Sequence, residues 1–191
     1  GYDKTTISTN SDYTGKLEDY SNFNTNVILR EDAPTLLLMP SESKLLQAEA
    51  ALRNWVAGDP EALYKEAICL SMQEQKEAYG VSISEQQVND YLAQNLFANA
   101  ASQEEKLEVL GNEYWVTTFM NGYESYANWR RCGYPKLTPT LYAGNESNGQ
   151  IHRRLPYAFD EYTINKANGE PAVQQQGADN LNTRIWWDVA K

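Results

Sequence analysis

The sequence predicts a mainly α-helical protein in which long irregular segments flank the helices. Apolar residues recur at steps of three and four over much of residues 41–133, which is the period of a helix. Helix start and stop signals bracket these stretches. Residues 1–35 and 134–191, in contrast, are rich in polar and turn-forming residues and show no sustained period. We therefore expect helices in the middle and loops at both ends.

The first helical stretch begins at Pro40–Ser41, where Ser41 is the expected N-cap. Its apolar face is predicted to continue to Trp55 and Val56, and Gly58 is the expected stop. The residues that define this face are Leu45, Ala48, Leu52 and Trp55/Val56.

A second helix follows at once, with Asp59 as N-cap and Pro60 at its first position. Gly80 is expected to end it in the left-handed conformation. A turn of only two or three residues forces the two helices to fold back on each other, so residues 41–80 predict a helical hairpin of tetratricopeptide-like size. Small residues are expected where the two backbones approach: Ala48, Ala50, Ala51, Ala62 and Ala67.

Two capping boxes predict further helices over residues 84–133. One pairs Ser84 with Gln87 and the other pairs Ser102 with Glu105. From Ser102 a broad aromatic and apolar face continues without a break in period, and we expect most of it to lie in the core. Its members are Leu107, Leu110, Tyr114, Trp115, Phe119, Tyr123, Tyr126 and Trp129 or Arg130.

The stretch FMNGYESYANWRRCGYPKL at residues 119–137 combines rings with adjacent arginines, which raises the question of a binding site. Its rings recur at helical steps, and Arg130 and Arg131 fall in the last turn, where cations interact favourably with the helix terminus. Gly133 and Pro135 are the expected stop signals. We therefore interpret the stretch as the end of a buried helix with structural arginines.

The irregular ends contain a few local features. A short strand is expected near Asn26–Leu29 and a short helix over Pro171–Gln176. The segment Thr183–Asp188, TRIWWD, is interpreted as apolar packing in preference to a sugar-stacking platform. Asn145–Ser147 matches a glycosylation sequon, which is a common chance match.

Composition excludes several classes of function. The net charge of −10 disfavours binding to nucleic acid or to an anionic membrane surface. The longest apolar run, at residues 33–39, falls far short of the ~20 residues of a membrane span. A single histidine makes a histidine-based metal site or catalytic triad improbable. Cys69 and Cys132 either pair in a disulfide or are two small buried residues, and the second alternative is favoured.

Several stretches, taken in order, resemble the C-terminal part of the SusD/RagB family, in its SusD-like branch. The resemblance covers residues 31–189. The stretches that carry it are Ala33–Pro34, SESKLLQAEAAL at 41–52, EYWVTTF at 113–119, GYESY at 122–126, RRCGYPKL at 130–137, RLPY at 154–157 with Glu161 and Asn165, and TRIWWD at 183–188.

The resemblance implies a SusD-like fold, with tetratricopeptide-like hairpins as scaffold and long irregular loops as ligand face. It implies a lipid-anchored protein on the outer surface of Bacteroidetes-type bacteria, which covers a SusC-like TonB-dependent transporter and delivers oligosaccharides or peptides to it. It implies no catalytic centre. Residues 1–191 would be the C-terminal part of one such domain, divided into segments 1–35, 41–80, 84–133 and 134–191. The start, GYDK, is no signal peptide, so the lipid anchor would lie outside this sequence.

Exposed rings on loops, with amide side chains beside them, are the candidate ligand contacts, because rings stack on sugars and amides bind hydroxyls. These candidates are Tyr13, Tyr20, Phe23 and Tyr142, with Asn22 and Asn145 as polar partners. We expect no metal or cofactor, since no calcium-loop spacing is present.

Two other function classes were weighed. A helical-hairpin adaptor that binds a protein partner without a small ligand is the principal alternative to a nutrient-binding protein. A glycoside hydrolase needs two carboxylates across a cleft, and neither Asp160/Glu161 nor Glu42/Glu49 stands out as such a pair.

Overall fold

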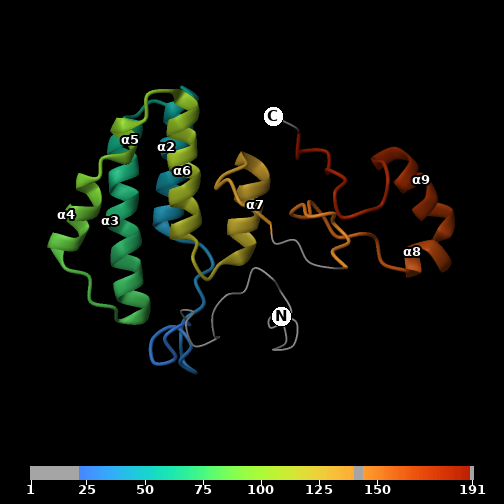
Figure 1. The fold of residues 1–191 in the computed structure, drawn as a ribbon, viewed down its shortest axis with the longest axis horizontal. Helices are drawn as coiled ribbons and strands as arrows, with labels where there is room; N and C mark the ends of the chain where they lie inside the picture. The colour runs from blue at the N-terminus through green and yellow to red at the C-terminus, as the bar shows by residue number, and fades with distance from the viewer. Residues whose placement is uncertain (1–21, 140–143, 190–191) are drawn as a thin grey trace. The chain divides into compact units, whose positions relative to one another are not determined.

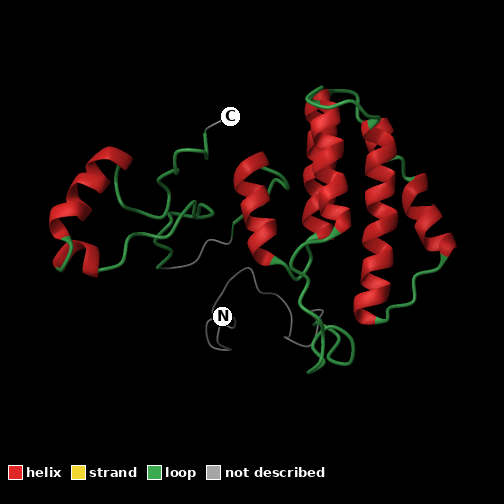
Figure 2. Cartoon of the chain, turned by 180° about the vertical axis from the view of Figure 1, so that it is seen from behind, coloured by secondary structure: helices red, strands yellow, loops and turns green. Residues whose placement is uncertain are grey.

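The computed structural model of the chain describes residues 22–139 and 144–189, and helices are the only regular secondary structure in these ranges. The predicted mainly α-helical class is therefore confirmed (Figure 1, Figure 2). Within these ranges, none of the helices has the length and apolar content that a bilayer crossing needs. The helices are α2 (Pro40–Leu52), α3 (Pro60–Tyr79), α4 (Glu85–Ala93), α5 (Leu96–Asn99), α6 (Gln103–Thr117), α7 (Gly122–Cys132), α8 (Asp160–Thr163) and α9 (Lys166–Gln176).

The chain divides into two compact units, each described by itself. Unit 1 comprises Gly1–Lys16 and Leu137–Lys191, and unit 2 comprises Leu17–Lys136. Helices α2 to α7 belong to unit 2, whereas α8 and α9 belong to unit 1. The expectation of a single SusD-like domain over residues 1–191 stays a prediction.

Helices α2 and α3 form the predicted hairpin, and small residues allow their close approach. Ala48 and Ala67 are completely buried and Ala51 nearly so, whereas Ala50 is only partly buried and Ala62 is exposed. Figure 1 shows α2, α3 and α6 side by side, and they enclose one apolar core together with α5. Its buried members are Leu45, Ala48, Tyr64, Ala67, Ile68, Phe97, Leu110 and Tyr114.

The ends of α2 differ from the prediction. Met39 is the N-cap and Pro40 the first helical residue, so Ser41 lies inside the helix, where its backbone N–H donates to Glu74 at 2.9 Å. The helix ends at Leu52, six residues before Gly58, because Asn54 adopts a positive φ of 59°. The connection is therefore longer than the expected two or three residues, and Trp55 is 72% exposed instead of continuing the apolar face.

The remaining start signals are confirmed. Asp59 caps α3 by accepting hydrogen bonds from the N–H groups of Glu61 and Ala62, and Gly80 ends that helix with a φ of 67°. Both capping boxes form as predicted, at the start of α4 and at the start of α6. Each of these signals involves residues no more than four positions apart, so each can be recognised from the sequence alone.

The broad aromatic face predicted from Ser102 onwards is interrupted. Helix α6 ends at Thr117, Met120 takes a φ of 73°, and Asn121 caps a separate helix α7 by accepting from the N–H of Glu124. The rings consequently separate: Tyr114 and Trp129 are buried, but Tyr123 is 92% exposed. The prediction that most of this face lies in the core is wrong for Trp115, Phe119 and Tyr123, which are all exposed.

The end of α7 matches its interpretation as a structural helix terminus, with Gly133 at a φ of 81°. Arg131 donates from Nη1 and Nη2 to the two carboxylate oxygens of Glu49 on α2, at 2.9 and 2.6 Å, and Arg53 donates to the same carboxylate at 2.9 Å. Burial raises the pKa of Glu49, but these arginines outweigh burial and hold it below its usual range. The pair thus ties α7 to the hairpin.

Three further predictions are corrected. Residues 25–28 form a turn in place of the strand expected at Asn26–Leu29, because the N–H groups of residues 27–29 all donate to the carbonyl of Asn24. The short helix expected at Pro171–Gln176 begins five residues earlier, at Lys166. No disulfide joins Cys69 and Cys132, and Cys69 is exposed, so neither the disulfide nor the burial of both residues is found.

Unit 1 contains a short helical corner formed by α8 and α9. A Cβ atom on Gly169 would lie 2.4 Å from the carbonyl oxygen of Glu161, so only glycine permits this approach of the two helices. Most of the other described residues of the unit form irregular chain.

The carboxylates of Glu42, Glu74 and Glu124 lie close enough to interact electrostatically. Glu42 is only 2% exposed, and one of its carboxylate oxygens has no hydrogen-bond partner within the described ranges. Burial, together with the charges of Glu124 and Glu74, raises the pKa of Glu42 from 4.5 to about 7. Glu42 therefore takes up a proton in the folded chain at a pH where it is ionised in the unfolded chain.

We expect Glu42→Gln to stabilise the chain above neutral pH. In the wild type the folded state binds more protons than the unfolded state between pH 4.5 and about 7, so the free energy of unfolding falls as pH rises through this window. The variant should be more stable at pH 8 by about 1–3 kcal/mol and nearly equal at pH 4.5. Urea unfolding at several pH values measures this. The exposed Glu77→Gln is the control, and parallel pH curves for wild type and Glu42→Gln would contradict the prediction.

Arg131→Met should lower the free energy of unfolding by about 2 kcal/mol, because it leaves the buried Glu49 with only Arg53. The value is at the low end for a buried pair because the Arg131 side chain is 42% exposed. Lys136→Met is the matched control, since it breaks an ion pair with Glu108 in which the lysine is 70% exposed, and it should change stability by less than about 0.5 kcal/mol. Equal losses in the two variants would show that Arg131 has no special role.

Candidate functional site

Half of the predicted ligand residues lie outside the described part of the chain: Tyr13, Tyr20 and Tyr142. Asn22 and Phe23 belong to unit 2 and Asn145 to unit 1, so each is described within its own unit. Phe23 is half exposed, and its ring meets Phe119 edge-on at 5.7 Å between centroids. A ligand role for these six residues stays a prediction.

The side chain of Asn145 stabilises the turn in which Asn145 lies. Its side-chain oxygen accepts hydrogen bonds from the backbone N–H and the hydroxyl of Ser147, at 2.8 and 2.6 Å. Ser147 is itself buried. This is the Asx-turn arrangement that stabilises many loops, and it accounts for Asn145 without a ligand.

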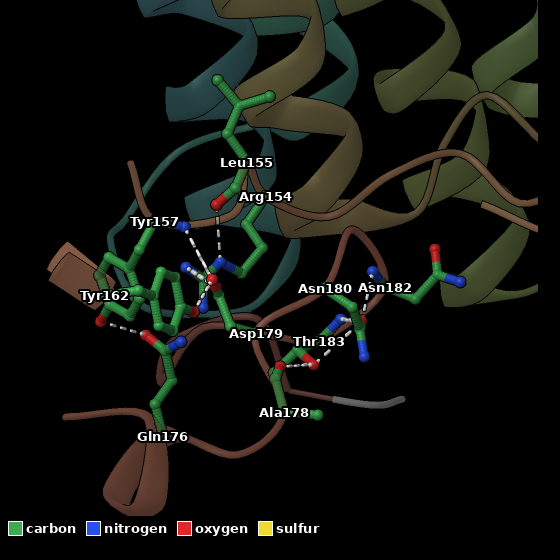
Figure 3. Close-up of polar contacts among 10 residues, drawn as sticks. All are labelled: Arg154, Leu155, Tyr157, Tyr162, Gln176, Ala178, Asp179, Asn180, Asn182 and Thr183. Carbon is green, nitrogen blue, oxygen red and sulfur yellow. Dashed lines mark hydrogen bonds and ion pairs between the residues drawn. The ribbon is translucent and has the colours of Figure 1, made fainter. Parts of the chain in front are cut away.

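A cluster that the sequence did not single out lies in unit 1. We call it the polar centre, and it consists of Arg154, Tyr157, Tyr162, Gln176 and Asp179. Figure 3 shows Arg154, Tyr157 and Tyr162 converging on the Asp179 carboxylate. The ion pair between Arg154 and Asp179 is 2.7 Å long, and both side chains are less than 10% exposed.

The Asp179 carboxylate receives donors from three directions. Besides Arg154, the backbone N–H of Tyr157 donates to both oxygens, at 3.2 and 3.0 Å, and the hydroxyl of Tyr162 donates to one of them. The hydrogen bond to Asp179 raises the pKa of Tyr162, so this phenol stays protonated and keeps donating at neutral pH. The single carboxylate of Asp179 thus fixes the positions of Arg154, Tyr157 and Tyr162.

The guanidinium of Arg154 is also held by stacking. It lies 4.7 Å from the centroid of the Tyr157 ring, and the hydroxyl of that ring donates to Oε1 of Gln176 at 3.1 Å. Two buried donors of the polar centre, Nη1 of Arg154 and Nε2 of Gln176, have no acceptor among the residues that the structure describes. The centre therefore has donors to spare for an ordered water or another oxygen acceptor.

A second anchor, which we call the Asp188 clasp, holds the end of the chain. The fully buried carboxylate of Asp188 pairs with Arg184 at 2.6 Å and with Arg153 at 3.4 Å. The backbone N–H of Asp188 donates to the carbonyl of Ile185 at 2.9 Å and closes a turn. Trp186 lies within that turn and is 90% exposed, so the interpretation of this segment as apolar packing is wrong for Trp186.

The polar centre and the clasp are joined through consecutive residues. Arg154 reaches Asp179 and Arg153 reaches Asp188, while the backbone N–H groups of both arginines point to the carbonyl of Leu181, at 2.7 Å from Arg153 and 3.4 Å from Arg154. In the sequence, Arg154 and Tyr157 belong to the stretch RLPY, which carries the family resemblance, but nothing local identified the partners of the two arginines.

The ion pairs and hydrogen bonds of the polar centre and the Asp188 clasp hold the loops of unit 1 in place. The carboxylate pairs weighed for hydrolysis do not face each other across an open cleft: Glu42 and Glu49 are buried on α2, and Asp160 and Glu161 are neighbours on the short helix α8. Among the residues that the structure describes, no group of three or more His, Cys, Asp or Glu side chains is placed to hold a metal ion. On these loops unit 1 displays aromatic rings, amide groups and guanidinium groups.

The described residues thus combine a helical hairpin in unit 2 with long, ion-paired loops in unit 1. The protein-family model described as SusD-like, Susd and RagB outer membrane lipoprotein, matches residues 4–188. The chain belongs to the SusD-like family. A comparison with curated proteins found no match.

Solved structures agree with this assignment. A Bacteroidetes SusD-like protein, AC2a, is 31% identical with a TM-score of 0.81, and the match covers 87% of this chain and 33% of that one. A chitin-binding protein is 37% identical with a TM-score of 0.69, over 79% and 33% of the two chains. A chitin-binding SusD homologue from Flavobacterium johnsoniae is 30% identical with a TM-score of 0.65, over 81% and 37%.

These similarities confirm the predicted SusD-like fold. They also show that the chain spans about a third of the length of the relatives it matches, at 33%, 33% and 37%.

Asp179→Asn should loosen unit 1 locally, because it leaves the buried Arg154 without its counter-charge. We expect the local opening free energy around residues 157–163 to fall by about 3 kcal/mol, which is roughly a 100-fold faster amide exchange. Hydrogen exchange followed by mass spectrometry measures this. Asp160→Asn, at an exposed position on α8, is the matched control. Unchanged protection of residues 157–163 in Asp179→Asn would show that the ion pair does not hold the loop.

Proposed function

We propose that the protein to which this chain belongs is a cell-surface lipoprotein that captures an oligosaccharide and delivers it to a SusC-like TonB-dependent transporter. The observation that carries the proposal is membership of the SusD-like family together with two solved relatives that are named as chitin-binding, at 37% and 30% identity. Chitin fragments, which are oligomers of N-acetylglucosamine, are therefore the first ligands to test.

The chemistry of unit 1 supports a neutral glycan. Exposed rings, among them Phe159 at 77% and Tyr162 at 38%, can stack on the apolar faces of sugar rings. The exposed amide side chain of Asn180 can exchange hydrogen bonds with hydroxyl and acetamido groups, whereas the amide of Asn182 already donates to the carbonyl of Ser147. The net charge of −10 favours an uncharged ligand over a polyanion.

The description of the family as one of outer membrane lipoproteins supports a membrane location for the full-length protein. In this proposal a lipid on the full-length protein anchors it to the outer membrane, and the protein binds its ligand without turning it over. A peptide ligand is the alternative within the same role.

Unit 2 supports the presence of a protein partner. It leaves Trp55, at 72%, and Leu37 and Leu38, at 76% and 75%, open to solvent. These side chains lie in the segments that flank α2, and large exposed apolar side chains of this kind occur on surfaces that meet another protein. A pure adaptor without a small ligand remains the second candidate, and in the main proposal the partner is the transporter.

The full-length protein should bind chitin oligosaccharides in a saturable manner in isothermal titration calorimetry. Cello-oligosaccharides of equal length and a mixed peptide pool are the comparison ligands, because they separate recognition of the acetamido group from general sugar or backbone binding. Hydrolysis products should be absent after prolonged incubation, as judged by mass spectrometry.

Partner capture completes the test. Protein solubilised from native membranes should be acylated and should co-purify with a β-barrel transporter. A protein that binds none of the sugars but retains a protein partner would favour the adaptor, and release of shorter sugars would favour a hydrolase.

A further inference from the structure

Glu42 is buried in unit 2 near the start of α2, and three neighbouring helices bring acidic groups toward it. Its side chain is 2% exposed, and one of its oxygens has no hydrogen-bond partner among the described residues. Glu74 on α3 and Glu124 on α7 add carboxylate charges of the same sign, and Tyr114 on α6 adds a phenol that senses the charges of Glu42 and Glu124. The cluster thus lies where the hairpin, α6 and α7 meet.

Three cations of the neighbouring segments are bound to other acids. The pairs are Arg131 with Glu49, Lys44 with Glu66 and Arg30 with Asp32. The backbone N–H of Met39 donates to Glu42 and favours its charged form, but burial and the like charges outweigh this hydrogen bond. A buried carboxylate that faces like charges takes up a proton at a pH where an exposed carboxylate stays ionised.

Helix α7 lies outside the apolar core of unit 2. The described members of this core come from α2, α3, α5 and α6. The last turn of α7 is tied to α2 by the bidentate pair of Glu49 and Arg131, which keeps that end in place. Of the helices around Glu42, α7 is therefore the one that a change of charge can displace at the lowest cost in apolar contacts.

The first turn of α7 carries Glu124 and is attached to α6 and the turn after it by hydrogen bonds. The hydroxyl of Tyr114 donates to Glu124 over the long distance of 3.4 Å, and the hydroxyls of Thr118 and Ser125 lie 2.8 Å apart. Ionisation of Glu42 sets its charge against that of Glu124 in a poorly solvated place, where charges repel more strongly than in water. The repulsion acts against these few polar attachments.

From this arrangement we propose that Glu42 is a pH-sensitive switch, which lets the first turn of α7 pack against the hairpin while it is protonated and releases that turn when it ionises. Release admits water to Glu42, so its pKa falls from about 7 toward the ordinary value of 4.5. Release is therefore increasingly favoured as pH rises from 4.5 to about 7, and the effect levels off above that range. The inference concerns unit 2 and is independent of the proposed function.

The test is hydrogen exchange of the full-length protein between pH 5 and pH 8, with each rate divided by the intrinsic exchange rate at that pH. Amides of residues 125–129 in α7 should lose protection about tenfold or more over this range, whereas amides of residues 107–111 in α6 should change by less than about threefold. Glu42→Gln should remove the pH dependence of α7, and Glu124→Gln should reduce it. Glu77→Gln, at an exposed position on α3, is the matched control and should behave like the wild type.

Three results would overturn the inference. Protection of residues 125–129 that does not change with pH in the wild type would show that α7 is insensitive to the charge of Glu42. An equal loss of protection in α6 and α7 would show a change in global stability alone. An unchanged pH dependence in Glu42→Gln would assign the effect to another group. The comparison of α7 with α6 in the wild type needs no substitution, so it decides the matter even where a variant folds poorly.

Discussion

Two consecutive arginines hold the loop-rich unit together, because each one reaches a different buried carboxylate. Arg154 pairs with Asp179 and Arg153 with Asp188, and the two acids lie in the segment that returns past the arginines. Most of this segment is irregular, so helices contribute little to fixing it. Buried ion pairs of this kind add little net stability compared with apolar packing, but they are intolerant of losing one member. Here these ion pairs restrict the irregular segment to one conformation among the many that it could otherwise adopt.

The helical unit uses charge in a different way. Its core is apolar and formed by the hairpin of α2 and α3 with α5 and α6, and the bidentate Glu49–Arg131 pair attaches α7 at the edge. Deeper in the same unit Glu113 accepts hydrogen bonds from the hydroxyls of Tyr64 and Tyr91, at 3.2 and 2.9 Å. Burial raises the pKa of Glu113, although the two phenols partly offset this effect. Polar groups in this core are paired across helices, which gives the packing a fixed register.

The sequence predicted those features whose causes are local. Capping boxes, the Asp59–Pro60 start and the Gly80 and Gly133 stops all act within a few residues, and all were found. The break at residues 118–121 was missed because the apolar period continues across it, and only the positive φ of Met120 reveals the change of direction. The polar centre and the exposure of Trp186 could not be predicted, because their causes are residues distant along the chain. Periodicity indicates that a ring can be buried, and only the fold decides whether it is.

Loops usually accommodate insertions and deletions, but the length of this one is constrained at both ends. Arg153 and Arg154 lie in a bend and each reaches a different carboxylate, so a shift of one residue there would move both side chains away from their partners. Both pairs would break together, and the turn that carries Trp186 would lose its anchor. Changes in length are thus tolerable only between the fixed points, in the corner formed by α8 and α9, and even there Gly169 restricts the approach of the two helices. The side chains that the segment displays can therefore vary from one protein to another while the length of the segment stays constant.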